Sequence, residues 1–469
     1  MKKYITVIGL EIHAELLTQT KVFCGCKNSF GGRVNGNCCP VCTGMPGTLP
    51  VLNSKAVELA IAAGLSFGCQ ITRHTLWDRK NYFYPDLAKA YQISQLYAPV
   101  CVGGGLEIGG RFISLTRIHL EEDAGKLVHS RGATLIDYNR AGVPLIEIVT
   151  EPDLRSADEA AEFVENVRRT LVYAGVSDGK MEQGSLRVDA NVSIMLEGAD
   201  KLGTRTEIKN LNSFKFIKKA VEFEVERQAG VLESGGRVIQ ETRRFDEASG
   251  ETFSMRSKED AQDYRYFPDP DILPLIISDC DIERISRDLP ESPSKRFSRY
   301  IGYGVSATDA GVILENKAVA DFYDACIRAG ANPISALNAV KGELLRHFKP
   351  EGGDKIDVSP TDFVRALSLA DSGEISGNGL KTAIRRMYAE GKPLDEIIKE
   401  EGLIIKEDSA AVRSAVLEVL NQNPKAVEQY KNGDVKVLSF FMGQCARLLK
   451  GAAHAKTIQE ILLSELTAK

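Results

Sequence analysis

The spacing of hydrophobic positions along the chain changes about two-thirds of the way from its start. Up to about residue 290, short segments alternate apolar and polar residues, a pattern typical of half-buried β-strands. These segments include residues 5–8, 113–115, 145–149 and 186–189. Two helices are expected among them, because apolar residues recur at helical spacing over 158–173 and 216–228. The first part of the chain is therefore predicted to be rich in sheet.

Prolines interrupt this pattern at 268, 270 and 274 and again at 290 and 293. A proline cannot donate a hydrogen bond to a sheet, so continuous strands are expected to end here. Further along, apolar residues follow helical spacing. The expected helices cover residues 309–329, 333–348, 412–420, 424–431 and 434–450. We therefore expect an α+β protein with a largely antiparallel, sheet-rich domain at 1–294, a helical domain at 295–405 and a small helical tail at 406–469.

Length and charge narrow the classes of function. A chain of 469 residues has room for about three domains. Lys and Arg number 59 against 64 Asp and Glu, so the net charge of −5 excludes a generally basic surface for nucleic acid. Any contact with a polyanion must then come from a local patch. A run of about 18 apolar residues is missing, and Glu11 and His13 precede any possible signal-peptide core, so a cytoplasmic protein without a membrane span is expected.

Five of the ten cysteines fall within residues 24–42. Cys24 and Cys26 form one close pair and Cys39 and Cys42 another, and two such thiolate pairs suit tetrahedral Zn²⁺. Cys38 is an additional candidate, but Cys39 keeps the C-x₂-C spacing of a zinc knuckle. Four thiolates leave no open coordination position, so such a zinc would be structural. The alternative is a group of reduced cysteines without metal.

Several predicted strands carry their polar side chains on one face. Alternation places Glu11, His13 and Glu15 on one side of the first strand and apolar residues on the other. The same rule groups Arg187, Asp189, Asn191 and Ser193, and then Arg205, Glu207 and Lys209; Glu121, Glu122 and Asp123 are a third acidic source. If these strands are neighbours, their carboxylates and the imidazole could bind a hard cation such as Mg²⁺. The alternative is a set of ordinary solvated strand faces.

Basic residues near these segments could neutralise phosphate groups, as phosphoryl transfer requires. The candidates are Arg79, Lys80, Lys126, Arg140, Arg187, Arg205 and Lys209. The chain has no Walker A sequence, because neither Gly125-Lys126 nor Gly179-Lys180 has the upstream glycine and the following Ser or Thr. A classical P-loop is thereby excluded.

Longer strings of residues resemble the GatB/GatE family, the B subunits of tRNA-dependent amidotransferases. The strings are residues 9–13, 78–86, 90–95, 119–126, 139–147, 184–191, 207–213, 241–246 and 263–268. The resemblance covers essentially the full chain. It implies a cradle-like catalytic domain, then the helical domain, then a tail of the YqeY type that binds tRNA.

The resemblance also implies an activity. An enzyme of this family converts Glu-tRNA(Gln), Asp-tRNA(Asn) or both to the amide, using ATP to phosphorylate the side-chain carboxylate and ammonia to displace the phosphate. The ammonia comes from a glutaminase subunit, GatA, and a small subunit, GatC, completes a heterotrimer. This chain has neither a Ser-Ser-Lys amidase signature nor a Cys-His glutaminase arrangement, so its ammonia is expected from another chain.

Site residues follow from the same resemblance. The Mg²⁺ ligands it implies are Glu11, His13, Glu121, Glu122 and Glu207, and Asp189 joins Glu11, His13, Glu122 and Glu207 in the catalytic set. Contacts to phosphate or the tRNA end are expected from Arg79, Lys80, Lys126, Arg140 and Arg187. The quartet Cys24, Cys26, Cys39 and Cys42 matches a zinc-bearing branch of the family, and Arg447 and Lys450 form a basic helix face for tRNA. The competing hypothesis is a non-enzymatic, zinc-containing scaffold that binds RNA.

Overall fold

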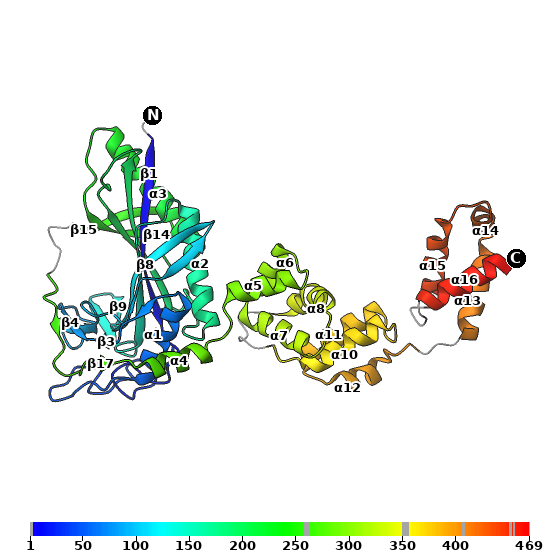
Figure 1. Ribbon diagram of the computed structural model, residues 1–469, viewed down its shortest axis with the longest axis horizontal. Coiled ribbons are helices and arrows are strands. Elements are labelled where there is room, and N and C mark those ends of the chain that lie inside the picture. The colour runs from blue at the N-terminus through cyan, green and yellow to red at the C-terminus, as the bar shows by residue number, and fades with distance from the viewer. Residues whose placement is uncertain are drawn as a thin grey trace. The chain divides into compact units, whose positions relative to one another are not determined.

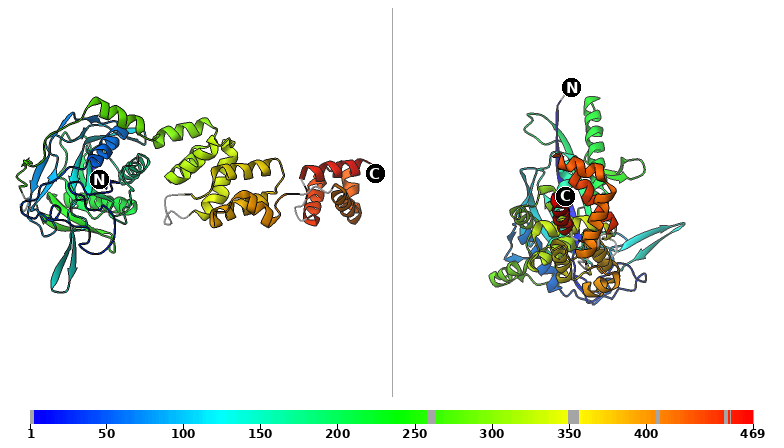
Figure 2. Two further views of the ribbon diagram at one scale, coloured as in Figure 1. Left: turned by 90° about the horizontal axis from the view of Figure 1, so that it is seen from below. Right: turned by 90° about the vertical axis from the view of Figure 1, so that its right-hand side faces the viewer.

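The computed structural model describes residues 3–257, 263–348, 356–405, 409–449, 453 and 455–468. The chain divides into two compact units, Met1–Pro293 and Ser294–Lys469. The first unit contains the strands, and the described part of the second is drawn as helices and loops (Figure 2). The expected α+β class with a sheet-rich first part is confirmed. The further division of the helical part near residue 405 stays a prediction.

A ten-stranded sheet forms the centre of the first unit (Figure 1). Its strands are β1 (Tyr4–Glu15), β2 (Gln70–Ile71), β6 (Cys101–Val102), β7 (Gly105–Ile108), β8 (Arg111–Glu122), β11 (Pro144–Thr150), β12 (Leu186–Leu196), β13 (Thr206–Lys209), β14 (Glu241–Asp246) and β15 (Glu251–Ser257). The order is β15-β14-β13-β12-β1-β11-β8-β6-β2, with β7 beside β8. Among these described strands, β13 and β14 form the one parallel pair, which agrees with the predicted antiparallel character.

Three short sheets flank the main one. The strand β4 (Asp78–Asn81) lies between β5 (Tyr91–Ser94) and β16 (Phe267–Pro268). The strands β9 (Lys126–Ser130) and β10 (Ala133–Asp137) form a hairpin, and β3 (His74–Thr75) pairs with β17 (Leu275–Ile276). The β4 sheet therefore ties residues near 80 to residues near 267, which are far apart in the sequence.

One face of the central sheet is apolar and is covered by helices. Ile8, Leu10 and Ile12 of β1 are buried in the same core as side chains of α1 (Ser54–Ser66), α2 (Ala157–Tyr173) and α3 (Phe214–Glu233). The side chains of Asn53, Ser156 and Ser213 cap these helices by accepting backbone N–H bonds. Helices on one face leave the polar residues of β1 on the opposite face, as the alternation predicted.

The helices of the second unit differ from expectation at two places. Residues 309–329 form two helices, α6 (Ala307–Leu314) and α7 (Lys317–Arg328), because Asn316 accepts bonds from the amides of Ala318 and Val319 and starts a new helix. Residues 333–348 form α8 (Pro333–Ala339), a π-helical turn at Val340–Leu344 and α9 (Leu345–His347). The other described helices before the tail are α5 (Pro293–Gly302), α10 (Pro360–Asp371), α11 (Gly377–Glu390) and α12 (Leu394–Glu401), while α4 (Asp279–Asp288) belongs to the first unit.

The tail contains α13 (Ser409–Gln422), α14 (Pro424–Lys431), α15 (Val437–Leu448) and α16 (Ala455–Ala468) around a core of its own. Phe441 and Cys445 of α15 are buried, and Leu438, Met442 and Leu449 pack against them, which confirms the predicted apolar face. Arg447 is exposed, as expected, whereas Lys450 lies outside the described residues. Among the described helices, none is both long and apolar enough to cross a membrane.

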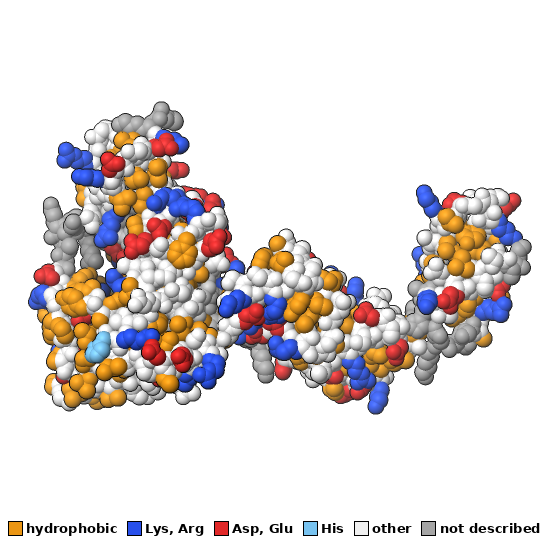
Figure 3. Space-filling view, viewed as in Figure 1, with side chains coloured by type: hydrophobic (Ala, Val, Ile, Leu, Met, Phe, Trp, Pro, Cys, Tyr) orange, Lys and Arg blue, Asp and Glu red, His pale blue; other side chains and the backbone are white. Residues whose placement is uncertain are grey.

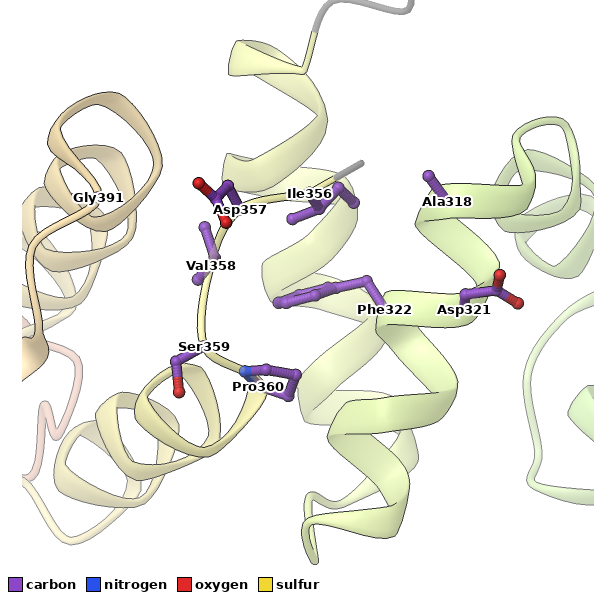
Figure 4. A pocket seen from close by; sticks show the side chains of 9 residues that line it. All are labelled: Ala318, Asp321, Phe322, Ile356, Asp357, Val358, Ser359, Pro360 and Gly391. Carbon is purple, nitrogen blue, oxygen red and sulfur yellow. The ribbon is translucent and has the colours of Figure 1, made fainter. Parts of the chain in front are cut away.

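A cavity of about 580 Å³ lies in the helical unit between α7 and residues 356–360 (Figure 4). The ring of Phe322 extends from α7 toward the segment that carries Val358, while Asp321 points away from that segment. Asp321 is ion-paired with Arg296 and Lys317. Ser359, which also lines the cavity, caps α10. The polar groups of this cavity thus serve the packing of the helices.

Candidate active site

The polar face of the sheet brings side chains from five strands together. Because β1 lies between β11 and β12, His13 stands opposite Glu147 on one side and Arg187 on the other. Glu11 stands opposite Asp189 of β12. The adjacency that the sequence could not show is therefore present. The outer neighbours β8 and β13 add two further carboxylates to this face.

The first group of ligands is His13, Glu121 and Glu147, whose donor atoms lie within 4.8 Å of one another. His13 Nε2 is 3.4 Å from Glu121 Oε1 and 3.6 Å from Glu147 Oε2. His119 of β8 completes the group, with Nε2 at 3.3 Å from Glu147 Oε2. Glu121 and His119 are buried, and two carboxylates are thus held beside two imidazoles with little water.

Electrostatic interactions within this group raise the pKa values of both imidazoles. Burial alone lowers the pKa of an imidazole, but the carboxylates of Glu147 and Glu121 outweigh burial here. They raise the pKa of His13 and bring that of His119 to about 9. The two carboxylates therefore demand positive charge, which imidazolium protons or a divalent cation can supply. Oxygen ligands from two carboxylates and one imidazole nitrogen fit such a cation.

The second group of ligands is Glu11, Asp189 and Glu207, again within 4.8 Å of one another. Burial and the nearby carboxylate of Glu147 raise the pKa of Glu11. Lys209 lies among them, with Nζ at 2.6 Å from Asp189 Oδ2 and 2.8 Å from Glu207 Oε1. This ammonium neutralises one of the three carboxylates of the second group, so the remaining negative charge also suits a cation.

Glu122 does not join either group. Alternation along β8 turns it away from Glu121, and its carboxylate accepts the amide of Ile93 at 2.9 Å and pairs with Lys89. The ligands that the sequence placed in a single set therefore lie in two neighbouring groups, and Glu122 contacts the edge of the β4 sheet instead.

Of the five residues that the resemblance implies as contacts to phosphate or the tRNA end, Arg79 and Arg140 are engaged in other contacts. Arg79 Nε lies 2.7 Å from Asp269 Oδ2, and its second nitrogen is 2.6 Å from Asp271. Arg140 donates to the carbonyls of residues 124 and 125 at 3.0 and 2.9 Å. Both guanidinium groups thus hold loops in place, and the structure favours a structural role over phosphate contact for them.

The other three basic candidates differ in their surroundings. Arg187 pairs with Asp123 at 2.8 Å, and its Nε is buried without a hydrogen-bond partner among the described residues. Burial alone would lower the pKa of Lys80, but the negative charges of Glu121 and Glu147 raise it. Lys126 is exposed at the start of β9. Lys80 and Arg187 therefore face the acidic groups, whereas a phosphate contact by Lys126 stays a prediction.

A cavity of about 510 Å³ opens beside Glu11. Its floor is the polar face of β1, β11 and β12, including Gly9, Asn191 and Ser193, and the segment around Arg205 closes one side. Gly9 carries no side chain there, so the cavity extends down to the strand backbone. A small molecule bound in it would have one end at the carboxylate of Glu11.

The four expected cysteines come together at a separate place. The sulfur atoms of Cys24, Cys26, Cys39 and Cys42 lie within 4.8 Å of one another, and tetrahedral zinc requires sulfur separations of about 3.8 Å at its usual bond length. The amide of Cys39 donates to Cys42 Sγ at 3.2 Å, a bond that stabilises negative charge on this sulfur. Cys38 points instead toward two asparagine oxygens. The donor set thus fits the zinc site with the ligands chosen from the sequence.

A fully buried lysine accompanies this cluster. Within the described chain, the partners of Lys21 Nζ are Cys42 Sγ at 3.6 Å and the Tyr138 carbonyl at 3.3 Å. A buried ammonium group needs a negative partner, and a thiolate at Cys42 provides one. A hydrogen bond from Cys24 lowers the pKa of Cys42 to about 4, and Lys21 contributes to the same shift. Lys21 therefore offsets the negative charge that four thiolates place on a divalent metal.

Replacing Lys21 by Met is expected to weaken zinc binding by about 10–100-fold, the usual effect of removing a group that supports a metal ligand. Competition with a chromophoric chelator measures this affinity. Lys27→Met is the matched control, because Lys27 is exposed and lies in the same loop. Equal zinc affinities for the Lys21 and Lys27 variants would contradict this role for Lys21.

Two side chains of these groups, Glu147 and His119, were not among the site residues expected from the sequence. Lys209 was expected on the same face as Glu207, but its ion pair with Asp189 was not. Alternation was the available signal for the first two. His119 and Glu121 share a face of β8 by that rule, and Glu147 points to the polar face from the middle of β11.

Comparison with known proteins adds an independent line of evidence. The model of the GatB/GatE catalytic domain matches residues 6–283, and a model called GatB domain matches residues 321–466. A protein of Ruminiclostridium cellulolyticum, named as the B subunit of aspartyl/glutamyl-tRNA(Asn/Gln) amidotransferase, is 52% identical over 99% of this chain and 98% of its own length. Proteins with the same name from Caldicellulosiruptor saccharolyticus and Syntrophotalea carbinolica are 49% and 48% identical, each over 99% of its own length.

Proposed function

The chain belongs to the GatB/GatE family, and from this premise we propose that it is the B subunit of an aspartyl/glutamyl-tRNA(Asn/Gln) amidotransferase. As such it is part of a ligase that serves protein biosynthesis. Its substrates are Glu-tRNA(Gln), Asp-tRNA(Asn) or both, and its product is the corresponding amide. The observation that carries the assignment is that two clusters of acidic side chains lie on the polar face of the central sheet. That sheet lies in the part of the chain that matches the family's catalytic domain.

The reaction has two steps. The side-chain carboxylate of the esterified amino acid attacks the γ-phosphorus of ATP, an acyl phosphate forms and ADP leaves. Ammonia then attacks the acyl carbon, phosphate leaves and the nitrogen loses a proton to give the amide. The first step is necessary because a carboxylate is a poor acceptor for ammonia until one of its oxygens becomes a leaving group.

The first group of ligands, His13, Glu121 and Glu147, is the site we assign to Mg²⁺, and the second group, Glu11, Asp189 and Glu207, lies beside it. These side chains would hold the ion, whose charge would offset that of the phosphates of ATP. Lys209 holds Asp189 and Glu207 in place by its two ion pairs. Arg187 has a buried Nε that can donate to a substrate oxygen, and Lys80 adds positive charge on the same side.

The cavity beside Glu11 suits the nucleoside of ATP, because it leaves the phosphates directed toward the carboxylate groups.

Arg205→Ala is expected to raise the KM for ATP about tenfold with a smaller effect on kcat, since a charge-assisted hydrogen bond is worth about 1.5–3 kcal/mol. Initial rates at varied ATP measure the effect. Arg237→Ala, which removes an exposed arginine outside the cavity, is the control. An unchanged KM for ATP in the Arg205 variant would contradict the assignment of this cavity to the nucleoside of ATP.

Two other regions serve binding and stability in this proposal. The cysteine quartet holds a structural Zn²⁺, because its four thiols leave no position for substrate. The exposed Arg447, together with Lys450, contacts the tRNA backbone through the tail. Ammonia reaches the site from a glutaminase subunit, GatA, and GatC completes a heterotrimer that works in the cytoplasm, where charged tRNA is used.

The proposal is tested by amide formation in the reconstituted complex. Glu-tRNA(Gln), ATP and Mg²⁺ are supplied with ammonium chloride as nitrogen donor, and the amino acid released from the tRNA is identified by chromatography. We expect glutamine to form only when ATP is present. Formation of amide without ATP, or no amide with either charged tRNA, would refute the assignment. A zinc-containing RNA scaffold without activity is not favoured, because the similar full-length proteins are named as amidotransferase subunits.

A further inference from the structure

Three tyrosine rings form a wall beside the first group of ligands. The ring centroids of Tyr82 and Tyr264 are 5.9 Å apart, and those of Tyr264 and Tyr266 are 6.1 Å apart, both in edge-to-face contact. Lys80 Nζ lies 4.9 Å from the centre of the Tyr264 ring. We call Lys80, Tyr82, Tyr264 and Tyr266 the tyrosine wall. It combines aromatic faces with a cation, and the rings come from segments far apart in the sequence.

The backbone of this wall is held in an unusual conformation. Arg265, between the two later tyrosines, has φ of 45°, a left-handed value that costs energy for a residue with a side chain. Asn81 of β4 supports it, because its amide donates to the Tyr264 carbonyl at 2.9 Å and its side chain donates to the Arg265 carbonyl at 2.8 Å. Such strain tends to persist where it positions groups for a function. Here it places two rings against a third.

The wall adjoins the site of chemistry. Lys80 stands opposite Gln92 of β5, and the side-chain amide of Gln92 donates to the Glu122 carbonyl at 2.7 Å, directly after Glu121 of the first group of ligands. The carboxylates of Glu121 and Glu147 also act electrostatically on Lys80 and Tyr266. Further aromatic side chains are exposed close by in the chain, since Phe83 is 74% and Tyr84 is 57% exposed. In the space-filling view, hydrophobic side chains gather around β3, β4 and β17 in this part of the unit (Figure 3). An apolar, aromatic surface therefore borders a charged reaction site.

This chemistry suits an unpaired nucleotide. Bases that are not paired stack on aromatic side chains, and lysines contact the phosphates between them. Of the acidic residues around β16, Asp269 and Asp271 are neutralised by Arg79, and Asp263 accepts a hydrogen bond from the amide of Arg265. The amino acid to be modified is esterified to the terminal ribose, so only a few covalent bonds separate its carboxylate from that nucleotide. The terminal nucleotide must then lie close to the acidic groups.

We infer that the tyrosine wall binds the unpaired 3′-terminal adenosine of the aminoacyl-tRNA by stacking, with Tyr264 as its central ring and Lys80 near the adjoining phosphate. The inference rests on the proposed function, since it names the part of the tRNA substrate that this side of the site holds. It adds a recognition element for the nucleotide that carries the amino acid. The nucleoside of ATP would bind in the separate cavity beside Glu11.

The test compares two uncharged RNA minihelices, one ending in CCA and one ending in CC, bound to the complex of the full chain with its partner subunits. The complex is expected to bind the CCA form about 5–100-fold more tightly, the range for stacking of one base. Tyr264→Leu should abolish this preference, and Tyr264→Phe, which keeps the ring, should restore it. Phe112→Leu is the control, because Phe112 is 62% exposed and lies outside the wall. Binding is measured by fluorescence anisotropy.

The outcomes separate the inference from the proposed function. An unchanged CCA preference in Tyr264→Leu overturns the inference, even if the complex still forms amide with ATP. A loss of ATP affinity without loss of the CCA preference also overturns it, because the rings would then hold the other substrate. Conversely, a complex that forms no amide but shows the tyrosine-dependent preference would refute the function alone. If Tyr264→Leu does not fold, Tyr82→Leu and Lys80→Met provide the same comparison.

Discussion

Glu147→Gln is expected to lower the rate of ATP-dependent amide formation by about 10²–10³-fold, the size of effect seen when one electrostatic group of a preorganised site is removed. Glu147 contacts both His13 and His119, at 3.6 and 3.3 Å, and stands next to Glu11. Glutamine keeps the volume of the side chain but removes its negative charge. The first group of ligands would then keep one carboxylate and lose its hold on a dication. Single-turnover assays with charged tRNA measure the rate.

The control for this prediction is Glu107→Gln, because Glu107 is an exposed carboxylate on β7 outside both groups. Affinity for uncharged tRNA should stay the same in both variants, since neither side chain belongs to the tyrosine wall or the tail. A wild-type rate for Glu147→Gln would show that the carboxylate has no part in the reaction. An equal loss of rate in Glu107→Gln would point to a general effect of charge.

Cys42→Ser is expected to release the zinc and to destabilise the loop at residues 24–42. Small zinc domains gain about 10–16 kcal/mol of apparent free energy from their metal, so loss of one of four thiolates has a large effect. Cys42 is the most buried of the four ligands, and it also accepts hydrogen bonds from Cys39 and Lys21. Metal analysis of the purified protein and limited proteolysis of the loop measure the two consequences.

Cys38→Ser provides a matched comparison, because Cys38 neighbours the ligand Cys39 but its sulfur points away from the cluster. This variant should keep its zinc and its resistance to proteolysis. Zinc retained in Cys42→Ser, or lost equally in Cys38→Ser, would refute the assignment of the four ligands. Addition of a strong chelator to the wild-type protein should reproduce the proteolysis pattern of Cys42→Ser.

Local rules predicted much of the fold because they depend on neighbouring residues. Alternation in β1 identified the face that carries Glu11 and His13, and helical spacing identified α2 and the apolar face of α15. The same rules were less successful at helix boundaries. Residues 309–329 divide into two helices because Asn316 caps the second, and a cap is a weaker signal than a hydrophobic stripe.

Strand alternation and cysteine spacing also contain information about the candidate site, and the sequence analysis used only part of it. Glu121 and Glu122 are consecutive, so they must lie on opposite faces of β8, and only one of them can join His13. Spacing selected, in a similar way, the four cysteines that the structure brings together, because C-x₂-C fits a knuckle and Cys38 breaks that spacing. In both cases the geometry of one strand or one turn was sufficient.

The sequence by itself determined the composition of each face, the spacing of the thiols and the family to which the chain belongs. The tertiary structure decided which faces meet. The neighbours of β1 in the sheet are β11 and β12. These strands begin about 130 and 170 residues after the end of β1, and no local pattern specifies their pairing with it. This pairing brings Glu147 to His13 and Asp189 to Glu11, and the separate pairing of β4 with β16 brings the ring of Tyr264 to Tyr82. Long-range pairing depends on the whole core, and for that reason the ligand groups and the tyrosine wall emerge only in the folded chain.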